Sequence, residues 1–190
     1  MTMAGLGLAD VGCAAPAMVQ QAIAPLAPPA GLVHYSGAPL GPLQPTVQGN
    51  KTGRYDKPDG LWVTVEGDDG WEAWCRGNEW GLDRLACVHD VVLDPAANIL
   101  CIADTAGLDA LTARYGRQPF GSGAAYGIEW ARVATDYQGI IIVPYVWKRA
   151  HSGCCTWYYG WDCASGCIWD AAAVRSVTLR SPADGVPAGG

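Results

Sequence analysis

The sequence predicts an α+β fold built as a single domain between residues 31 and 180. Strand-like runs occur singly and in pairs rather than in regular alternation with helices, which favours α+β over a βαβ architecture. The expected helices are short. Neither GxxxxGK[ST] nor a GxGxxG that follows a strand is present, so the phosphate loops of the common nucleotide-binding α/β folds are missing.

The first half of the domain contains two expected strands and a short helix. Residues 31–37 (GLVHYSG) predict a strand that ends in a turn, and residues 57–67 (KPDGLWVTVEG) predict a Pro-Asp-Gly turn that leads into a second strand. Residues 68–81 (DDGWEAWCRGNEWG) predict a helix that Asp68 or Asp69 caps and Gly77 ends.

The middle of the domain adds two strands and a helix. The Val, Ile and Leu of CVHDVVLD (87–94) and NILCIAD (98–104) favour strands joined by a turn at Pro95. A helix follows over 105–116 (TAGLDALTARYG), with Asp104 or Thr105 as its cap.

The last part predicts a helix over 128–138 (IEWARVATDYQ), a buried strand over 139–145 (GIIIVPY) and one or two strands within 164–180. Residues 1–30 are rich in Ala and Pro and are expected to form a flexible extension. Residues 181–190 (SPADGVPAGG) are expected to be a disordered tail.

Composition narrows the function. The formal net charge of −6 argues against broad, non-specific binding to nucleic acid or to an anionic membrane, although a single nucleotide can still enter a cleft. No apolar run reaches the roughly 18 residues of a membrane span, and the N-terminus is a poor match to a secretory signal. We therefore expect a soluble, cytoplasmic protein with no membrane partner. Eight cysteines in such a chain do not predict a disulfide framework.

The segment WYYGWDCASGCIWD, residues 157–170, is the most distinctive in the chain. It places Asp162 among three tryptophans and two tyrosines. Aromatic walls exclude water and orient a flat ring, and a carboxylate in such a place stabilises a developing positive charge. The alternative is that Asp162 ends a turn in a small aromatic core.

Four segments together resemble the ADP-ribosyltransferases whose signature is a histidine, a tyrosine and an acidic residue. They are HYSG (34–37), DGLWVTVEGDDGWEAWC (59–75), WARVATDYQGIIIVPY (130–145) and GCIWDAAAV (166–174). The resemblance implies a divergent member, such as a bacterial or phage-encoded effector. It also implies split antiparallel β-sheets with short flanking helices, NAD as co-substrate, and transfer of ADP-ribose to a protein or nucleic-acid acceptor. The oligomeric state stays open.

The resemblance also assigns roles to residues. His34 would hydrogen-bond the adenosine ribose, and Ser36 would meet the nicotinamide end. Trp62 stands where the family has its first tyrosine, and Trp74 stands near the second, with Trp71 as its neighbour. Both tyrosines are therefore replaced. The remaining expected members of the cleft are Tyr35, Gly60 and Thr64.

The acidic residue needs separate treatment. Counting back from Asp170, the family's acidic position falls on Ser165, and Asp162 lies three residues earlier. We predict that Asp162 is the catalytic carboxylate, together with His34. Cleavage of the nicotinamide–ribose bond passes through an oxocarbenium-like transition state, which such a carboxylate stabilises.

Three alternatives remain. A structural zinc site could use the cluster His151, Cys154, Cys155, Cys163 and Cys167, which would make the chain an interaction module. Cys167 could act as a nucleophile with His151 and Asp170. The chain could also keep the family's fold and bind a nucleotide without turnover.

Overall fold

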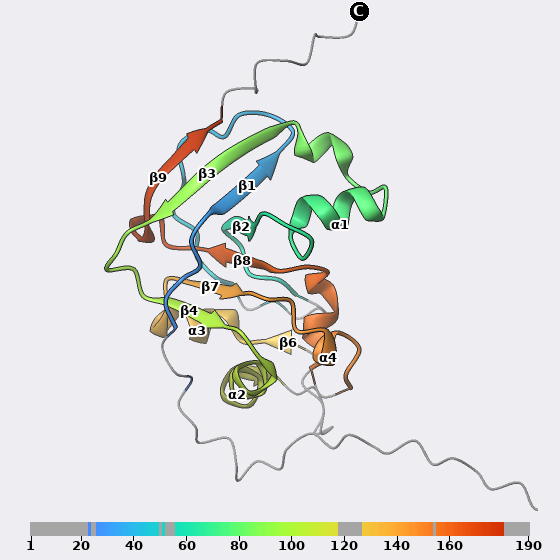
Figure 1. Cartoon of the computed structure of the whole chain (residues 1–190). Helices are drawn as coiled ribbons and strands as arrows, with labels where there is room; N and C mark the ends of the chain where they lie inside the picture. The colour runs from blue at the N-terminus through green and yellow to red at the C-terminus, as the bar shows by residue number, and fades with distance from the viewer. Residues whose placement is uncertain are drawn as a thin grey trace, which may run out of the picture.

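The structure is a computed structural model that describes residues 23, 26–49, 51, 56–117, 127–153 and 155–180. Its larger sheet has the strand order β4-β7-β8-β2-β1-β3-β9, and β5 and β6 form a separate two-stranded pair (Figure 1). The strands are β1 Leu32–Ser36, β2 Leu61–Val65, β3 Cys87–Leu93, β4 Ile99–Ile102, β5 Gly116–Arg117, β6 Gly127–Ile128, β7 Gly139–Ile142, β8 Ser165–Ile168 and β9 Val174–Leu179.

The described strands pair antiparallel except for β4 and β7, which are parallel. Together with the short helices, this confirms the predicted α+β class. The helical elements are α1 Trp71–Gly77, η2 Leu82–Leu85, α2 Thr105–Tyr115, α3 Trp130–Asp136, α4 Trp147–Ala150, η4 Thr156–Trp161 and η5 Ala171–Ala173.

The ladder between β1 and β2 is a short one within the larger sheet. β1 pairs with β2 through two residue pairs, Leu32 with Val65 and Val33 with Thr64, whereas β1 pairs with β3 through five and β2 with β8 through four. In Figure 1 the upper part, with β1, β3 and β9, runs at an angle to the lower part, with β8, β7 and β4. The seven strands of the larger sheet are thus continuous through a short junction, where the family resemblance implied split antiparallel β-sheets.

Local signals explain most of the helix boundaries. Asp104 caps α2, as predicted, by accepting a hydrogen bond from the Gly107 N–H at 2.8 Å. The prediction that Asp68 or Asp69 caps α1 is wrong: Gly70 is the cap residue, and no side chain caps the helix. The carboxylate of Asp69 instead accepts a hydrogen bond from the backbone N–H of Tyr145 at 2.5 Å. Asp69 therefore accepts a hydrogen bond from a backbone N–H far along the chain, and not from one at the start of α1.

The core lies on both faces of the larger sheet, and one of its two clusters reaches Leu32 of β1 and Val91 of β3. Along β4 and β7 alternate side chains point to opposite faces, so Leu100 and Ile140 join one cluster and Ile99 and Ile141 the other. The first cluster also contains side chains of α2, α3 and η4, which cover that face. All four residues of β7 are buried, as the run GIIIVPY predicted.

Both termini lie almost wholly outside the described residues. Of the expected N-terminal extension the structure describes residues 23 and 26–30, and residue Ile23 packs against the first core cluster. Residues 181–190 are not described. Within the described part of the chain, every helix is too short or too polar to cross a bilayer.

Candidate functional site

His34 lies on β1, just past the end of the short β1–β2 junction. Its Nδ1 is 2.6 Å from the backbone oxygen of Trp62 on β2. Because a carbonyl oxygen only accepts, Nδ1 must carry the proton, and Nε2 of the neutral ring is then an acceptor. Burial lowers the pKa of His34; the bond to Trp62 opposes this and the nearby His89 adds to it. The ring is therefore neutral near pH 7.

Trp62 connects this histidine to the predicted acid. The ring of Trp62 lies 5.1 Å from the ring of Trp161 and 5.3 Å from the Nζ atom of Lys57. The same Nζ atom is 3.7 Å from Oδ2 of Asp162. His34 thus contacts the Trp62 backbone, the Trp62 ring lies beside Lys57, and Lys57 pairs with Asp162; we call these four residues the junction site.

The Asp162 carboxylate is accessible and its backbone is unusual. Its side chain is 44% exposed, so it can meet a ligand without rearrangement of the core. Its φ of 40° and ψ of −38° place it in a region that non-glycine residues rarely adopt. The N–H of Cys163 donates to the carbonyl of Trp161, so Asp162 is the central residue of a γ-turn of the strained kind. Strain of this sort gathers at functional sites.

The aromatic side chain nearest His34 on α1 is Trp71. Its ring lies edge-on to the imidazole at 6.1 Å and to Tyr35 at 6.3 Å. Trp74, which the family resemblance placed near the second tyrosine, packs instead against Trp80 at 5.6 Å. The structure thus brings Trp71 to His34 and gives Trp74 a different ring as its neighbour.

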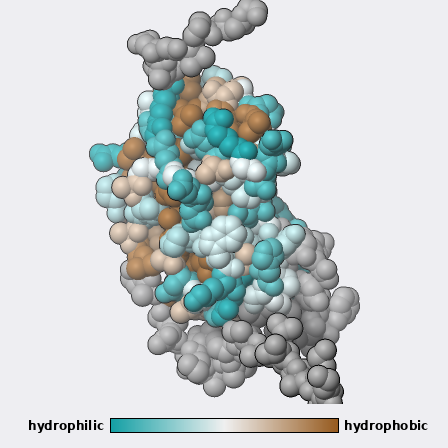
Figure 2. All heavy atoms as spheres, turned by 45° about the vertical axis from the view of Figure 1, so that its right-hand side comes forward, coloured by the Kyte–Doolittle hydropathy of each residue, from teal (hydrophilic) through white to brown (hydrophobic). Residues whose placement is uncertain are grey.

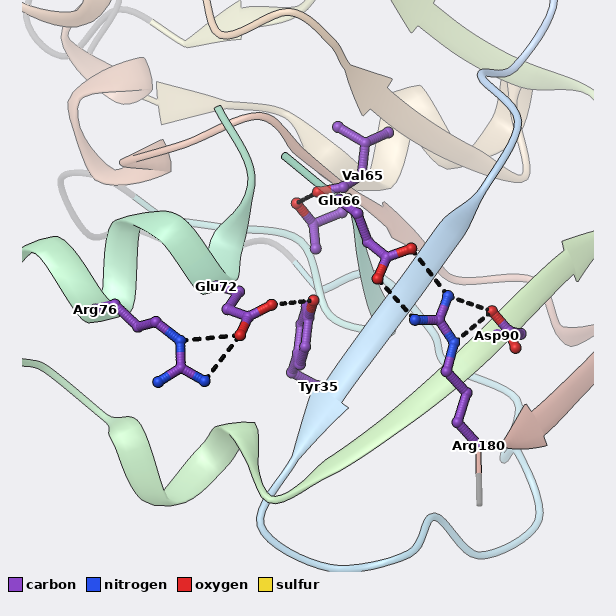
Figure 3. Close-up of polar contacts among 8 residues, drawn as sticks. Tyr35, Val65, Glu66, Glu72, Arg76, Asp90 and Arg180 are labelled. Atoms are coloured by element: carbon purple, nitrogen blue, oxygen red, sulfur yellow. Dashed lines mark hydrogen bonds and ion pairs between the residues drawn. The ribbon is translucent and has the colours of Figure 1, made fainter. Parts of the chain in front are cut away.

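Tyr35 takes part in a polar network beside the junction site. Its hydroxyl donates to Glu72 at 3.1 Å, and Glu72 also binds Arg76 (Figure 3). Burial, and then the Glu72 carboxylate, raise the pKa of Tyr35 to about 12. Figure 3 also shows Arg180 between Glu66 and Asp90. Tyr35 therefore positions α1 against β1.

Three further members of the predicted cleft have contacts within the fold. Thr64 is fully buried; its hydroxyl donates to the Ala164 carbonyl at 2.6 Å and accepts from the Trp71 N–H at 3.1 Å. Ser36 donates to the carbonyl of Ala38. Gly60 has a φ of 149°, and a Cβ there would lie 2.4 Å from the backbone oxygen of Ile168. Thr64 and Gly60 thus fix the backbone of β2 against its neighbours.

The tryptophans around Asp162 belong to a larger aromatic cluster. Trp130 lies 6.0 Å from Trp157, 6.3 Å from Trp161 and 6.4 Å from Trp169, measured between ring centres. These rings are almost completely buried. The Nε1 atom of Trp161 is buried without a hydrogen-bond partner among the described residues, whereas Trp130 donates to the Asp56 carbonyl at 2.9 Å. The cluster supports the turn that presents Asp162.

Sequence reasoning missed Lys57. This residue precedes the Pro-Asp-Gly turn that leads into β2, so its distance along the chain from Trp62 is short. That spacing could have indicated a cation beside the Trp62 ring. The partner carboxylate could not be read in the same way, because it lies in a remote part of the sequence.

The geometry gives the two cysteine hypotheses no support. Among the described residues, no three His, Cys, Asp or Glu side chains are placed to hold a metal, and Cys154 lies outside those residues. The thiol of Cys155 contacts Asp109, and the thiol of Cys167 contacts the Pro58 carbonyl. Burial raises the pKa of Cys167, which is the reverse of what a nucleophile needs.

Two hollows on the described surface are separate from the junction site. One of about 380 Å³ lies between residues 28–32 and 91–97, and one of about 520 Å³ lies between residues 45–48, α3 and η5.

Comparisons with protein-family models, curated proteins and solved structures find no match to the chain. We therefore infer the function from the residues and geometry of the junction site.

Proposed function

We propose that the protein is an NAD-dependent ADP-ribosyltransferase with an ADP-ribosyltransferase-like fold. It cleaves the nicotinamide–ribose bond and transfers ADP-ribose to a macromolecular acceptor. The observation that carries this proposal is the series of contacts in the junction site, which runs from the neutral imidazole of His34 to the Trp62 backbone, from the Trp62 ring to Lys57, and from Lys57 to the accessible carboxylate of Asp162. The β1–β2 ladder is short, but it keeps the sheet continuous where the family resemblance implies a split sheet, so the proposal rests on the junction site.

Each side chain of the junction site has a role in this reaction. The Nε2 atom of His34, which is an acceptor in this tautomer, takes a hydrogen bond from a ribose hydroxyl of NAD, and the Trp62 ring offers a face for the flat nicotinamide. Asp162 stabilises the positive charge that develops on the ribose as nicotinamide leaves with the bonding electron pair. The acceptor nucleophile then bonds to the ribose carbon and gives up its proton.

Lys57 is suited to exchange partners when NAD binds. Its ion pair with Asp162 is 3.7 Å long and joins side chains that are 40% and 44% exposed. Such pairs contribute at most about 1 kcal/mol, so breaking one costs little. We expect Lys57 to turn to the pyrophosphate of NAD, which leaves Asp162 free to face the ribose.

The test is release of labelled nicotinamide from NAD in the presence of cell extract, with transfer of a second label on the adenylate followed in parallel. Asp162→Asn keeps the size and tolerates the same backbone region. We expect it to lower release by about 100-fold or more. Asp83→Asn on η2 is the matched control and should match wild type. No release by wild type contradicts the proposal, and equal release by Asp162→Asn contradicts the role of that carboxylate.

A second candidate, nucleotide binding without turnover, rests on Ser165. This residue is the first of β8, where the family resemblance places the acid, and it is 5% exposed with its hydroxyl donated to the Cys163 carbonyl. If Asp162 does not supply the missing charge, NAD binds but nicotinamide stays attached. Binding of NAD measured by calorimetry, without release, would favour this candidate.

A further inference from the structure

A long connection without helix or strand follows β1. Residues 37–49 form no regular element in the structure, so individual contacts set their path towards β2. Gln48 fixes the far end: its side-chain amide donates to the Asp59 carbonyl at 2.6 Å and accepts from the Asp59 N–H at 3.0 Å. The near end continues directly from Ser36 of β1. The contacts of residues 37–47 therefore decide whether the connection stays on the sheet.

A histidine of β3 holds the middle of this connection. The Nε2 atom of His89 accepts a hydrogen bond from the backbone N–H of Leu40 at 3.1 Å. Within the described part of the chain, every other hydrogen bond of residues 37–47 spans only two positions along the sequence. The His89–Leu40 bond is thus the hydrogen bond that ties these residues to the sheet.

This bond determines the tautomer of His89. Because a backbone N–H only donates, Nε2 is unprotonated and Nδ1 carries the proton. The residue is 2% exposed, and its Nδ1 atom has no hydrogen-bond partner among the residues that the structure describes. A buried donor without an acceptor destabilises the state that contains it. The closed position of the connection is therefore favoured by a small margin, as a switch requires.

The ionisable group that faces His89 is a second histidine. His34 lies opposite His89 in the β1–β3 ladder, and the two rings are 5.9 Å apart. From the other side β9 places Leu179, which is apolar, opposite His89. Residues 37–48 contain no ionisable side chain. The connection and the paired position of β9 thus bring no charge to the ring.

The other polar side chains of β3 and β9 do not supply a counter-ion either. Alternate side chains of a strand point to opposite faces, so Cys87 shares a face with His89 whereas Asp90 lies on the other. The Asp90 carboxylate is 2.7 Å from the guanidinium group of Arg180 and is compensated there. Arg175, further along β9, is exposed. A positive charge on His89 therefore gains no carboxylate partner from these elements.

A proton on His89 is incompatible with its bond to Leu40. Both ring nitrogens of an imidazolium are donors, so Nε2–H would point at the Leu40 N–H. Protonation of His34 has no such effect, because its Nδ1 already donates to the Trp62 carbonyl. Burial lowers the pKa of His34 and the nearby His89 adds to this, so the two rings resist carrying charge together. His89 is thus the histidine whose charge is linked to the position of the connection.

We propose that His89 is a pH-sensitive switch, which holds residues 37–47 on the sheet when its ring is neutral and releases them when the ring is protonated. An imidazole in water takes up a proton near pH 6.5. The closed position requires the neutral ring, so it is favoured above this pH. Each pH unit below it favours release by up to about tenfold. Release breaks the Leu40 bond and gives water access to His89, while Gln48 still anchors the far end. The switch does not rest on the proposed function.

The third histidine of the chain provides a matched control. His151 follows α4 and is exposed. Figure 2 shows the side of the molecule that carries α1 and α4, where hydrophilic and intermediate residues mix and strongly hydrophobic ones form only small groups. An exposed imidazole takes up a proton from water without leaving a buried position. Its replacement should leave the behaviour of residues 37–47 unchanged.

The test is hydrogen exchange of the Leu40 amide, followed by NMR on the full chain and corrected at each pH for the intrinsic exchange rate. Protection of an amide measures how rarely its hydrogen bond opens. We expect the protection of Leu40 in the wild type to fall about tenfold between about pH 7.5 and about pH 5.5. The amide of Ile141 in β7, a residue that is 1% exposed, is the internal reference and should keep its protection.

Three variants assign the response. His89→Gln keeps an oxygen that can accept from the Leu40 N–H but cannot take up a proton, so Leu40 should stay protected at both pH values. His89→Phe removes the acceptor, so Leu40 should exchange rapidly at both. His151→Gln should respond as the wild type does. Circular dichroism of each variant shows whether the fold is kept.

Each contrary result overturns the inference. Constant protection of Leu40 in the wild type would do so. A fall of the same size in His89→Gln, or the loss of the response in His151→Gln, would assign it to another group. An equal fall at Ile141 would show that acid destabilises the whole fold. Because no measurement involves NAD, failure of the switch and failure of the proposed function are distinguishable.

Discussion

The backbone of Asp162 offers the sharpest test of the link between strain and function. At a φ of 40° a residue with a Cβ is strained, whereas glycine adopts such angles freely. We therefore expect Asp162→Gly to be more stable than Asp162→Ala, although glycine normally destabilises an ordered chain. Both variants should lose nicotinamide release to the same extent, because both lack the carboxylate.

The magnitude follows from three contributions. The strain of a residue in this region costs about 1–3 kcal/mol, and glycine removes it. Glycine also lowers the stability by about 0.5–1 kcal/mol relative to alanine, because it gives the unfolded chain more conformational freedom. The ion pair with Lys57, at most about 1 kcal/mol, is lost in both variants and cancels. The glycine variant should therefore be the more stable of the two by about 1 kcal/mol.

Thermal unfolding followed by circular dichroism measures this difference. For a chain of 190 residues, 1 kcal/mol corresponds to about 2–4 °C in Tm. Asp162→Asn serves as a third variant, because asparagine tolerates positive φ and should lie between the other two. If the alanine variant melts at the same temperature as the glycine variant or higher, the reasoning from φ is refuted.

Two further predictions concern stability. Trp161→Phe should cost about 1–2 kcal/mol less than Trp130→Phe in urea unfolding. It removes an N–H that has no partner in the described part of the chain, whereas Trp130→Phe removes one that is hydrogen-bonded; equal costs would contradict this. Hydrogen bonds from Arg180 lower the pKa of Glu66 and of Asp90 from their ordinary values of 4.5 and 3.8. The stability that these two carboxylates contribute is present above their ordinary pKa values and is lost as the pH falls through their lower pKa values in the folded protein. Arg180→Gln should therefore move the acid-unfolding midpoint upward by roughly a few tenths of a pH unit. An unchanged midpoint in an acid titration would show that these pairs do not contribute.

The sequence predicted the elements that local signals determine. The strand that carries His34, the turn before Trp62 and the helix capped by Asp104 all lie where nearby residues indicate them. Their causes act within a few residues: an apolar run, a Pro-Asp-Gly turn and an aspartate three residues before Gly107. These parts of the fold needed no knowledge of the rest of the chain.

Features decided by distant residues could not be predicted in this way. β3 and β4 follow each other in sequence, yet β3 pairs with β1 and β9 while β4 lies at the far edge beside β7. Asp69 is a good helix cap by position, but Tyr145 supplies a competing donor from 76 residues away. The contact of Lys57 with Asp162 depends likewise on how the strands are ordered. Which ring faces His34 was decided by the packing of α1, so Trp71 rather than Trp74 took that place.

The chain of neighbouring tryptophans has an optical consequence. Trp62 touches Trp161, which touches Trp130 and Trp157, and Trp130 touches Trp169. Indoles this close pass excitation energy from one to another, so light absorbed anywhere in the group reaches each member. A pyridinium ring stacked on the half-buried Trp62 would quench that shared excited state and so lower the fluorescence of the whole group. The unlabelled protein thus carries its own reporter of whatever occupies the place beside Asp162.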